Sequence, residues 1–272
     1  ALDVSSSQRT QATRQNAITD RIADLEVKAA QAEAEAAGLK ALASSTLAGS
    51  LTGTSVALVV LPGASDDDVS AIRSTLTDAG ASVVGRVTLT DNWQSTSMSQ
   101  YRTTLATTLA SHLQSGAAKT ASADGVVGYS IVQVLTSTGA ETDLLRQILT
   151  DKSTPLMTID EDPAGKATTL VAVGARAQST TSTQASVAAS SDAWIGLGLA
   201  VGSTSGVVVG DASSREAMIS QIRTSGTAVT TVDSVGTTLA SVDTALALST
   251  ASSGARAFGV GNGAQSVIPS SK

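Results

Sequence analysis

The feature of this sequence that most constrains its fold is a change of hydrophobic period between residues 47 and 53. Before this segment, apolar residues recur every three or four positions, as they do on one face of a helix. After it, they form continuous runs such as 56–61, which are typical of strands buried on both faces of a sheet. The segment itself holds Gly49, Gly53 and several hydroxyl residues, a composition typical of a linker. We therefore expect an N-terminal helix over 1–46, a linker over 47–53 and an α/β domain over 54–272.

The N-terminal helix carries a narrow apolar stripe. Residues 8–43 contain no proline and one glycine, and the stripe repeats with alternating spacings of four and three at Ile18, Ile22, Leu25, Ala29, Ala32, Ala36 and Leu39. This is the spacing of a coiled-coil seam over three heptads. A helix lying on its own globular domain is the alternative, but such a helix usually has a broader apolar face. The seam predicts a homo-oligomer, a dimer or larger. Because its alanines bury little area, the coil could also accept a helix of another protein.

Strand-like and helix-like segments alternate through the rest of the chain. The runs at 56–61 and 82–89 flank a helical pattern at 69–79, which together predict a βαβ unit. Further strands are expected at 156–159, 169–173, 207–209 and 228–232, and further helices at 98–113, 144–149, 218–222 and 239–246. The segment 125–136 fits either state, and the tail from Ser252 is expected to be irregular. The alternation predicts a doubly wound, mostly parallel α/β domain with a Rossmann-like or flavodoxin-like architecture.

Composition limits both the core and the partners. Only 2% of the residues are aromatic although 42% are hydrophobic, so the core must consist of small aliphatic side chains. The net charge is −6 and Lys and Arg form no cluster, which excludes nucleic acid as a partner because nucleic acid binds at basic patches. The absence of cysteine excludes disulfides and thiolate chemistry. The longest apolar candidate, 193–210, is interrupted by glycines and falls short of the roughly 20 apolar residues of a membrane span.

The strand at 56–61 leads through a Pro-Gly turn into three consecutive aspartates, Asp66, Asp67 and Asp68. A strand that enters a helix through a glycine turn is a common phosphate-binding arrangement. Here the three carboxylates would repel a phosphate, and they suit the positive end of the helix dipole. We therefore expect them to cap the helix, with Ser65 or Asp66 as the N-cap residue. A surface Ca²⁺ or Mg²⁺ site is the less favoured alternative.

No other segment predicts a catalytic or cofactor site. The glycines of 194–202 precede a strand instead of following one, so we interpret them as close helix packing, and those of 259–263 as a loop. His112 lies on the apolar stripe of its helix, which favours a structural role, and the acidic residues 160–162 are expected to form a solvated loop rather than a cation site. Copper prefers sulfur or imidazole ligands, and the residues that could supply them are far apart in the sequence: Met98, Met157, Met218 and His112. We expect no catalytic residue, no cofactor and no metal site, and therefore no enzyme.

Six segments and the N-terminal heptad helix together carry a family resemblance. The segments are GTSVALVVLPGASDDDV at 53–69, DAGA at 78–81, GRVTLTD at 85–91, GVVVG at 206–210, AFGVG at 257–261 and the Ile-Pro pair at 268–269. With them the chain resembles the MctB family of mycolic-acid-containing actinobacteria. The resemblance covers nearly the whole chain, and its motifs are structural, with no catalytic signature among them.

The resemblance implies an N-terminal transmembrane helix, a coiled coil and an α/β domain exposed to the cell envelope. This chain would then be the extracytoplasmic part without its anchor. The family is named for copper transport and is described as an outer-membrane channel, while corynebacterial members called SteB are linked to cell separation with a membrane partner, SteA, and a peptidoglycan hydrolase. Copper handling needs soft ligands, which are nearly absent from the sequence, whereas a scaffold needs an exposed coiled coil. The residues therefore favour a non-enzymatic, membrane-anchored scaffold or regulator of cell separation, with copper transport as the alternative.

Overall fold

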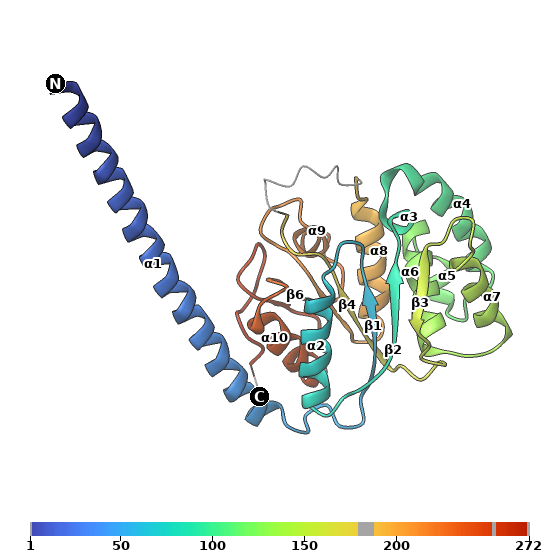
Figure 1. Cartoon of the computed structure of the whole chain (residues 1–272). Helices are drawn as coiled ribbons and strands as arrows, with labels where there is room; N and C mark the ends of the chain where they lie inside the picture. Colours follow the sequence, from blue (N-terminus) through green and yellow to red (C-terminus); the bar gives the residue numbers. More distant parts are fainter. Residues whose placement is uncertain (1, 179–187, 252–253, 271–272) are drawn as a thin grey trace. The chain divides into compact units, whose positions relative to one another are not determined.

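The computed structural model describes residues 2–178, 188–251 and 254–270, with side chains described from Val4 onward. It divides into two compact units, Ala1–Ala43 and Ser44–Lys272. A single helix, α1 (Leu2–Leu47), runs through the whole of the first unit (Figure 1). It is longer at both ends than the proline-free pattern at 8–43. It ends two residues before Gly49, whose φ of 71° lies in the left-handed region that glycine adopts readily after a helix.

The second unit is built around one seven-stranded sheet with the order β3-β2-β1-β4-β5-β6-β7. Its strands are β1 (Ser55–Val60), β2 (Ser82–Leu89), β3 (Met157–Glu161), β4 (Thr169–Val173), β5 (Val207–Val209), β6 (Thr230–Val232) and β7 (Ala257–Phe258). Every pairing is parallel except that of β2 with β3. The order reverses between β1 and β4, which makes this the switch point of a doubly wound sheet. The expected α/β fold class is confirmed.

Helices cover both faces of the sheet. They are α2 (Asp66–Asp78), α3 (Asp91–Gln94), the 3-10 turn η1 (Thr96–Met98), α4 (Ser99–Ala110), α5 (Gly116–Lys119), α6 (Ala123–Thr136), α7 (Ala140–Leu149), α8 (Ser191–Gly202), α9 (Met218–Thr224) and α10 (Thr238–Ser249). On one face α6 packs against α4, α7 and α8, and α8 also packs against α9; on the other face α2 packs against α10. The segment that the sequence left ambiguous is therefore the central helix of the larger layer.

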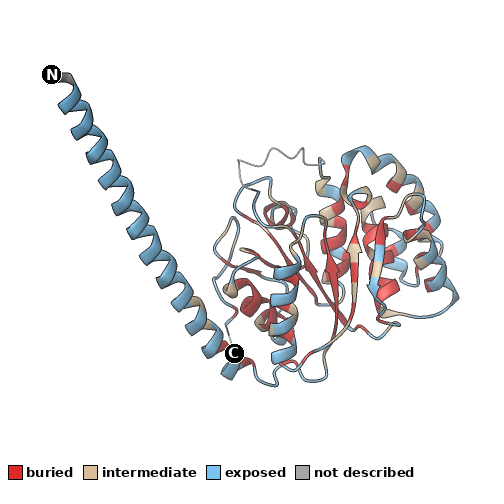
Figure 2. Cartoon of the chain, viewed as in Figure 1, coloured by how far each residue is buried: buried red, intermediate tan, exposed pale blue. Residues whose placement is uncertain are grey.

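Small aliphatic residues fill the core, as the composition requires. Ala57 and Val59 of β1 belong to the cluster that contains the buried side chains of α4, α6, α8 and α9. Their neighbours Val56 and Leu58 point to the opposite face because side chains alternate along a strand, and they are also fully buried. Figure 2 shows these buried strands between exposed outer helix surfaces. Burial on both faces explains why the run at 56–61 is continuously apolar.

Close helix packing at the glycines of 194–202 is present as expected. A Cβ atom on Gly196 of α8 would lie 2.4 Å from the backbone carbon of Asp124 at the start of α6, and one on Gly128 of α6 would lie 2.5 Å from the carbonyl oxygen of Gly196. Real Cβ atoms do not approach backbone so closely. The two helices therefore touch backbone to backbone, and only glycine permits this crossing.

Two expectations need correction. The tail after Ser252 was expected to be irregular, but Ala257 and Phe258 form β7, which pairs with β6 and extends the sheet. The helix expected over 98–113 ends at Ala110, so His112 lies in the turn that follows α4. β7 depends on pairing with a distant strand, and α4 ends where Ser111 and His112 donate tighter turn bonds to Thr108 and Leu109; hydrophobic spacing predicts neither.

Candidate functional site

The predicted coiled-coil stripe lies entirely within α1. In the chain taken alone its three large N-terminal members stay in solvent: Ile18, Ile22 and Leu25 are 53%, 51% and 54% exposed. Ala29 and Ala32 are also exposed, whereas Ala36 and Leu39 are partly buried. Apolar side chains left half-exposed on a single face of a helix mark an interaction surface rather than a core. That these residues form an interface stays a prediction, since the structure holds one chain.

The rest of the helix surface around this stripe is mixed, with charged and polar residues beside several alanines and the exposed Val27. Lys28 Nζ lies 3.1 Å from Asp24 Oδ2, one turn earlier, and both side chains are more than half exposed. A solvated pair of this kind contributes about 0.3–0.5 kcal/mol to a helix. In proteins, most of the stability of a helix comes from packing of its apolar face and not from helix propensity. A 46-residue helix whose apolar stripe is exposed can therefore gain most of its stability by burying that stripe against another helix.

The three aspartates lie in the first turn of α2, as expected, and Asp66 and Asp68 also form ion pairs. Ser65 is the N-cap residue, but its side chain makes no capping bond. Asp66 accepts a 2.9 Å bond from Arg86. Asp68 is almost fully buried and accepts bonds from Nε and Nη2 of Arg176 at 2.8 and 2.5 Å. Arg176 follows β4, so this pair occupies the carboxyl edge at the switch point, where doubly wound folds usually hold ligands.

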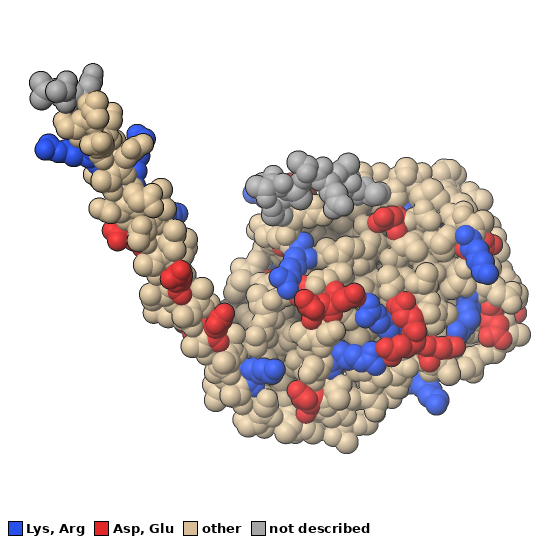
Figure 3. Space-filling model, in the orientation of Figure 1, with Lys and Arg blue, Asp and Glu red and all other residues tan. Residues whose placement is uncertain are grey.

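The acidic residues 160–162 are exposed to solvent, as expected, but only Asp162 lies in a loop. Asp160 and Glu161 lie in β3, and all three acids face arginines. Asp160 lies 3.5 Å from Arg86, Glu161 accepts two bonds from Arg73 at 2.6 and 2.8 Å, and Asp162 accepts two from Arg146 at 2.9 and 3.2 Å. The hydrogen bonds from these arginines lower the pKa of Glu161 and of Asp162. Figure 3 shows the alternating charges on this face. The cluster pairs the edge strand with its neighbours and leaves little free charge for a cation.

A second polar centre lies at the carboxyl ends of β5, β6 and β7. Asp233 is buried and accepts bonds of 2.9 Å from Arg223 and from the backbone N–H groups of Val260 and Gly261, and one of 2.7 Å from Ser234. Burial opposes its ionisation, but these donors hold its pKa below the ordinary value. From the sequence, 259–263 is expected to be a loop that binds no cofactor. The signal that could have found this centre is an aspartate directly after a buried strand, together with glycines that allow backbone donors to approach it.

This centre borders an open hollow of about 570 Å³. The hollow is lined by Asp211, Ala212, Ser213, Asp233, Ser234, Val260, Gly261, Asn262 and Gly263. Its carboxylates are already bonded within the protein, because Asp211 accepts bonds from the backbone and hydroxyl of Ser213 at 2.9 and 3.1 Å. The hollow therefore presents satisfied polar groups and backbone, not a pair of groups poised for acid–base chemistry.

One buried carboxyl has no partner. Asp243 of α10 is fully buried, and neither of its oxygens makes a hydrogen bond in the described chain. Burial, with the nearby negative charge of Asp233, raises the pKa of Asp243 to about 7. Nothing in the sequence marks this residue, because an aspartate in an amphipathic helical segment is expected to face solvent unless the helix is packed on that side as well.

The residues considered as copper ligands do not come together as a set. Met157 lies in edge strand β3 and Met218 in α9, both within the apolar core, and Met98 ends η1. His112 is half-buried, with Nδ1 2.5 Å from Glu141 Oε2. Within 2–178, 188–251 and 254–270, no three His, Cys, Asp or Glu residues are placed so that they could hold a metal ion. In the same ranges no helix combines the length and the apolar character needed to cross a membrane.

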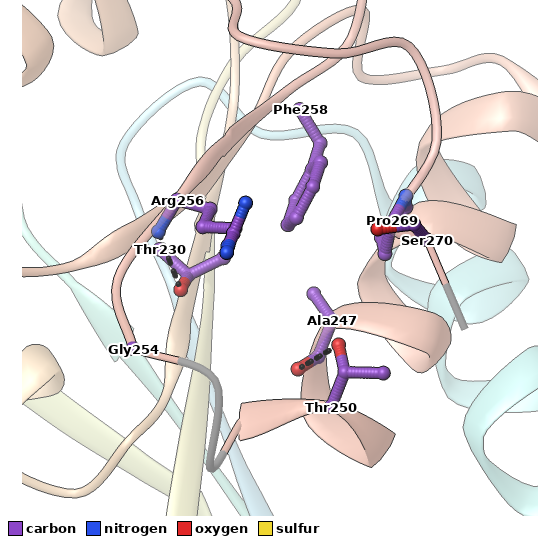
Figure 4. Close-up of a pocket in the computed structure, with 8 residues that line it drawn as sticks. All are labelled: Thr230, Ala247, Thr250, Gly254, Arg256, Phe258, Pro269 and Ser270. Carbon is purple, nitrogen blue, oxygen red and sulfur yellow. Dashed lines mark hydrogen bonds between the residues drawn. The ribbon is translucent and has the colours of Figure 1, made fainter. Parts of the chain in front are cut away.

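A small hollow lies between β6, β7 and the end of α10 (Figure 4). Arg256 and Thr230 lie on one side, Ala247 and Thr250 on another, and Phe258 and Pro269 close it. Its volume is about 40 Å³, whereas small-molecule sites usually measure roughly 300–1,000 Å³. It has room for water or one short side chain.

Comparison with known proteins gives one match. A family model described as "Copper transport outer membrane protein, MctB" matches residues 2–269, which spans both units. No curated protein matched the sequence.

Proposed function

The chain belongs to the MctB family, and from this premise we propose that it is a non-enzymatic scaffold of the cell envelope that acts through the stripe on α1. The stripe drives self-association into a dimer or larger oligomer. The same coil recruits a helical segment of a peptidoglycan hydrolase, or of its regulator, during cell separation. The α/β unit is carried by this coil.

The observation that carries the proposal is the exposure of Ile18, Ile22 and Leu25, three consecutive positions of the predicted stripe. Three more stripe positions are alanines, which contribute little apolar area but allow close approach of a second helix. A coil of this composition is weak along its C-terminal half. A weak coil exchanges partners more readily than a leucine-rich one, which suits recruitment of another protein's helix.

The resemblance to SteB supplies the rest of the proposal. It implies an extracytoplasmic location, an N-terminal transmembrane anchor and a SteA-like membrane partner. The paired charges at 66–68 and 160–162 agree with a domain whose surface is occupied by internal contacts. The proposal therefore places recognition on α1 and gives the α/β unit a structural role.

The test is the double variant Ile22→Asp plus Leu25→Asp. Two carboxylates in the seam would have to be desolvated on association, so the variant should be monomeric and should lose capture of the hydrolase helix. Light scattering measures the first effect and a pull-down with purified hydrolase the second. Val27→Asp is the matched control, since Val27 is 56% exposed on the same helix but lies outside the seam. If the double variant self-associates and captures its partner like the parent, the proposal is wrong.

Copper transport is the second candidate, because the family description names it. The simplest form of this idea is a monomer that retains copper. Equilibrium dialysis against Cu(I) and Cu(II) tests it directly. The scaffold proposal expects no retention above that of a Met98→Leu, Met157→Leu, Met218→Leu, His112→Gln variant. Stoichiometric retention lost in that variant would support the copper candidate.

A further inference from the structure

The seam of α1 continues toward the N-terminus with a different chemistry. Stepping back from Ile18 by three and four residues reaches Gln15, Gln11, Gln8 and Val4. Gln8, Gln11, Gln15 and Ile18 lie along one side of the helix, where they line a single shallow hollow. The seam therefore begins with three glutamine positions, continues with three large apolar positions and then with three alanines.

Charges flank the seam in a regular way. Arg21, Lys28 and Glu35 each directly precede a seam residue, and Glu26, Glu33 and Lys40 each directly follow one. In a parallel coiled coil whose two helices are in register, the residue just before a seam position of one helix lies beside the residue five positions later in the other helix, which just follows a seam position. Arg21 then faces Glu26 of the second helix, and Lys28 faces Glu33. Glu35 and Lys40 continue the pattern with the signs exchanged.

An antiparallel coil makes worse use of these residues. In an antiparallel coil, residues that precede seam positions lie beside each other across the two helices, and so do residues that follow seam positions. The register that aligns Ile22 with Ala32 brings Glu26 against Glu26 and Lys28 against Lys28. Moving by one heptad in either direction brings Glu26 against Glu33 or Arg21 against Lys28. Each of these registers contains a pair of like charges, which disfavours it.

The seam residues also favour the parallel arrangement. With Ile22 aligned to Ala32, the antiparallel register would place Gln15 against Leu39, which would bury an amide without a partner. In the parallel, in-register arrangement every glutamine meets a glutamine, and each amide can both donate and accept. Ile22 and Leu25 also fit, because Ile at the first and Leu at the second seam position of a heptad favours two-stranded parallel coils.

We propose that α1 pairs with α1 of a second copy of this chain as a parallel, in-register, two-stranded coil. The glutamine positions and the flanking charges fix its orientation, and Ile18, Ile22 and Leu25 supply its apolar contact. This inference rests on the proposed self-association through α1 and adds the partner, the orientation and the register. It places the C-terminal ends of both α1 helices at the same end of the coil.

Disulfide trapping tests the register, and the chain is suited to it because it contains no cysteine. In the proposed coil position 29 of one helix faces position 29 of the other, so Ala29→Cys should cross-link efficiently with oxidised glutathione and give a species of twice the 27.0 kDa chain mass. Val27→Cys, on the outer surface of the coil, should remain uncross-linked at the same protein concentration. Equal cross-linking of the two variants would overturn the inference.

Charge exchange tests the orientation. Glu26→Lys plus Glu33→Lys, and separately Arg21→Glu plus Lys28→Glu, should each halve the mass in light scattering, because each variant then opposes like charges. Mixing the two variants should restore dimers that contain one of each. A mixture that stays monomeric contradicts the inference.

A parent chain that is itself monomeric would contradict both the proposed function and this inference. If the parent associates but Ala29→Cys does not cross-link, only the orientation and register fail.

Discussion

At the scale of single residues, two buried aspartates of the α/β unit differ in whether they receive hydrogen bonds. Asp233 receives hydrogen bonds from an arginine, a hydroxyl and two backbone N–H groups, so its charge is compensated where it is buried. Asp243 is equally buried and receives none. Burial of a charge without a partner is costly, and such a group responds by staying protonated. Asp243 therefore makes the stability of the unit depend on pH.

The predicted dependence has a definite sign. The pKa of Asp243 is about 7 in the folded chain against an ordinary value of 3.8, so the folded state binds an extra proton between these two pH values. The free energy of unfolding should therefore fall as pH rises from 3.8 to about 7, by up to roughly 4 kcal/mol in total, and then level off. Urea unfolding of Asp243→Asn should lack this slope and show higher stability than the parent at pH 8. The exposed Asp143→Asn serves as control, and an identical pH slope in Asp243→Asn and the parent would contradict the assignment.

At the scale of elements, the contact between α6 and α8 decides how the larger helix layer is assembled. Gly128 and Gly196 allow the two backbones to touch, and this layer covers the sheet face that includes Ala57 and Val59.

The crossover connections that follow β5 and β6 lie on different faces of the sheet. α9 follows β5 and α10 follows β6, both leading to the next strand in the same direction, but α9 packs with α8 and α10 packs with α2. The two crossovers therefore have opposite hands, one of them the rare left hand.

The helix crossing gives a matched pair of predictions. Gly196→Ala should destabilise the unit by about 1–3 kcal/mol, because its Cβ would collide with the backbone of Asp124 and force α6 and α8 apart. Gly198→Ala in the same helix should be neutral or stabilising by up to about 1 kcal/mol, since the nearest atoms to its Cβ lie 3.5 Å away on Ile222 and Val229. Thermal unfolding of both variants checks the pair. Equal melting temperatures would show that the helices can separate without loss.

At the scale of the whole molecule, the boundary between the two units lies within α1. The first unit ends at Ala43, but the end of the helix belongs to the second. Leu47 and Leu51 are 4% and 1% exposed, and the backbone N–H of Leu51 donates a 2.9 Å bond to the carbonyl of Ala79 after α2. The residues expected to link two domains are thus partly built into the α/β unit.

Truncation tests this boundary. A fragment over 44–272 should be monomeric and should melt close to the full chain, because it keeps Leu47 and Leu51 and loses the stripe. A fragment over 55–272 should also be monomeric but less stable by at least roughly 2–5 kcal/mol, the usual cost of removing one large buried aliphatic side chain, because it loses both Leu47 and Leu51. Light scattering and urea unfolding measure the two properties. Self-association of the 44–272 fragment would locate assembly in the α/β unit instead of α1.

The sequence by itself determined the local features of this protein. Alternating spacings of three and four predicted α1. Apolar or otherwise strand-like segments predicted β1, β2, β4 and β5, and the glycines of 194–202 indicated close packing. These features depend on residues near one another in the chain, so periodicity and backbone preference are enough to read them. The resemblance to the MctB family came from the same local segments.

Only the tertiary structure decided which distant groups meet. Arg73 meets Glu161 across 88 positions and Arg176 meets Asp68 across 108, and no local pattern marks such pairs. Other features also depend on contacts between distant residues: the strand order, the face that α10 covers, the strand in the tail and the absence of a hydrogen-bond partner for Asp243. All depend on how strands pair and which surfaces they bury. Many strand orders are compatible with the same local pattern. The free energy of the whole core selects one of them.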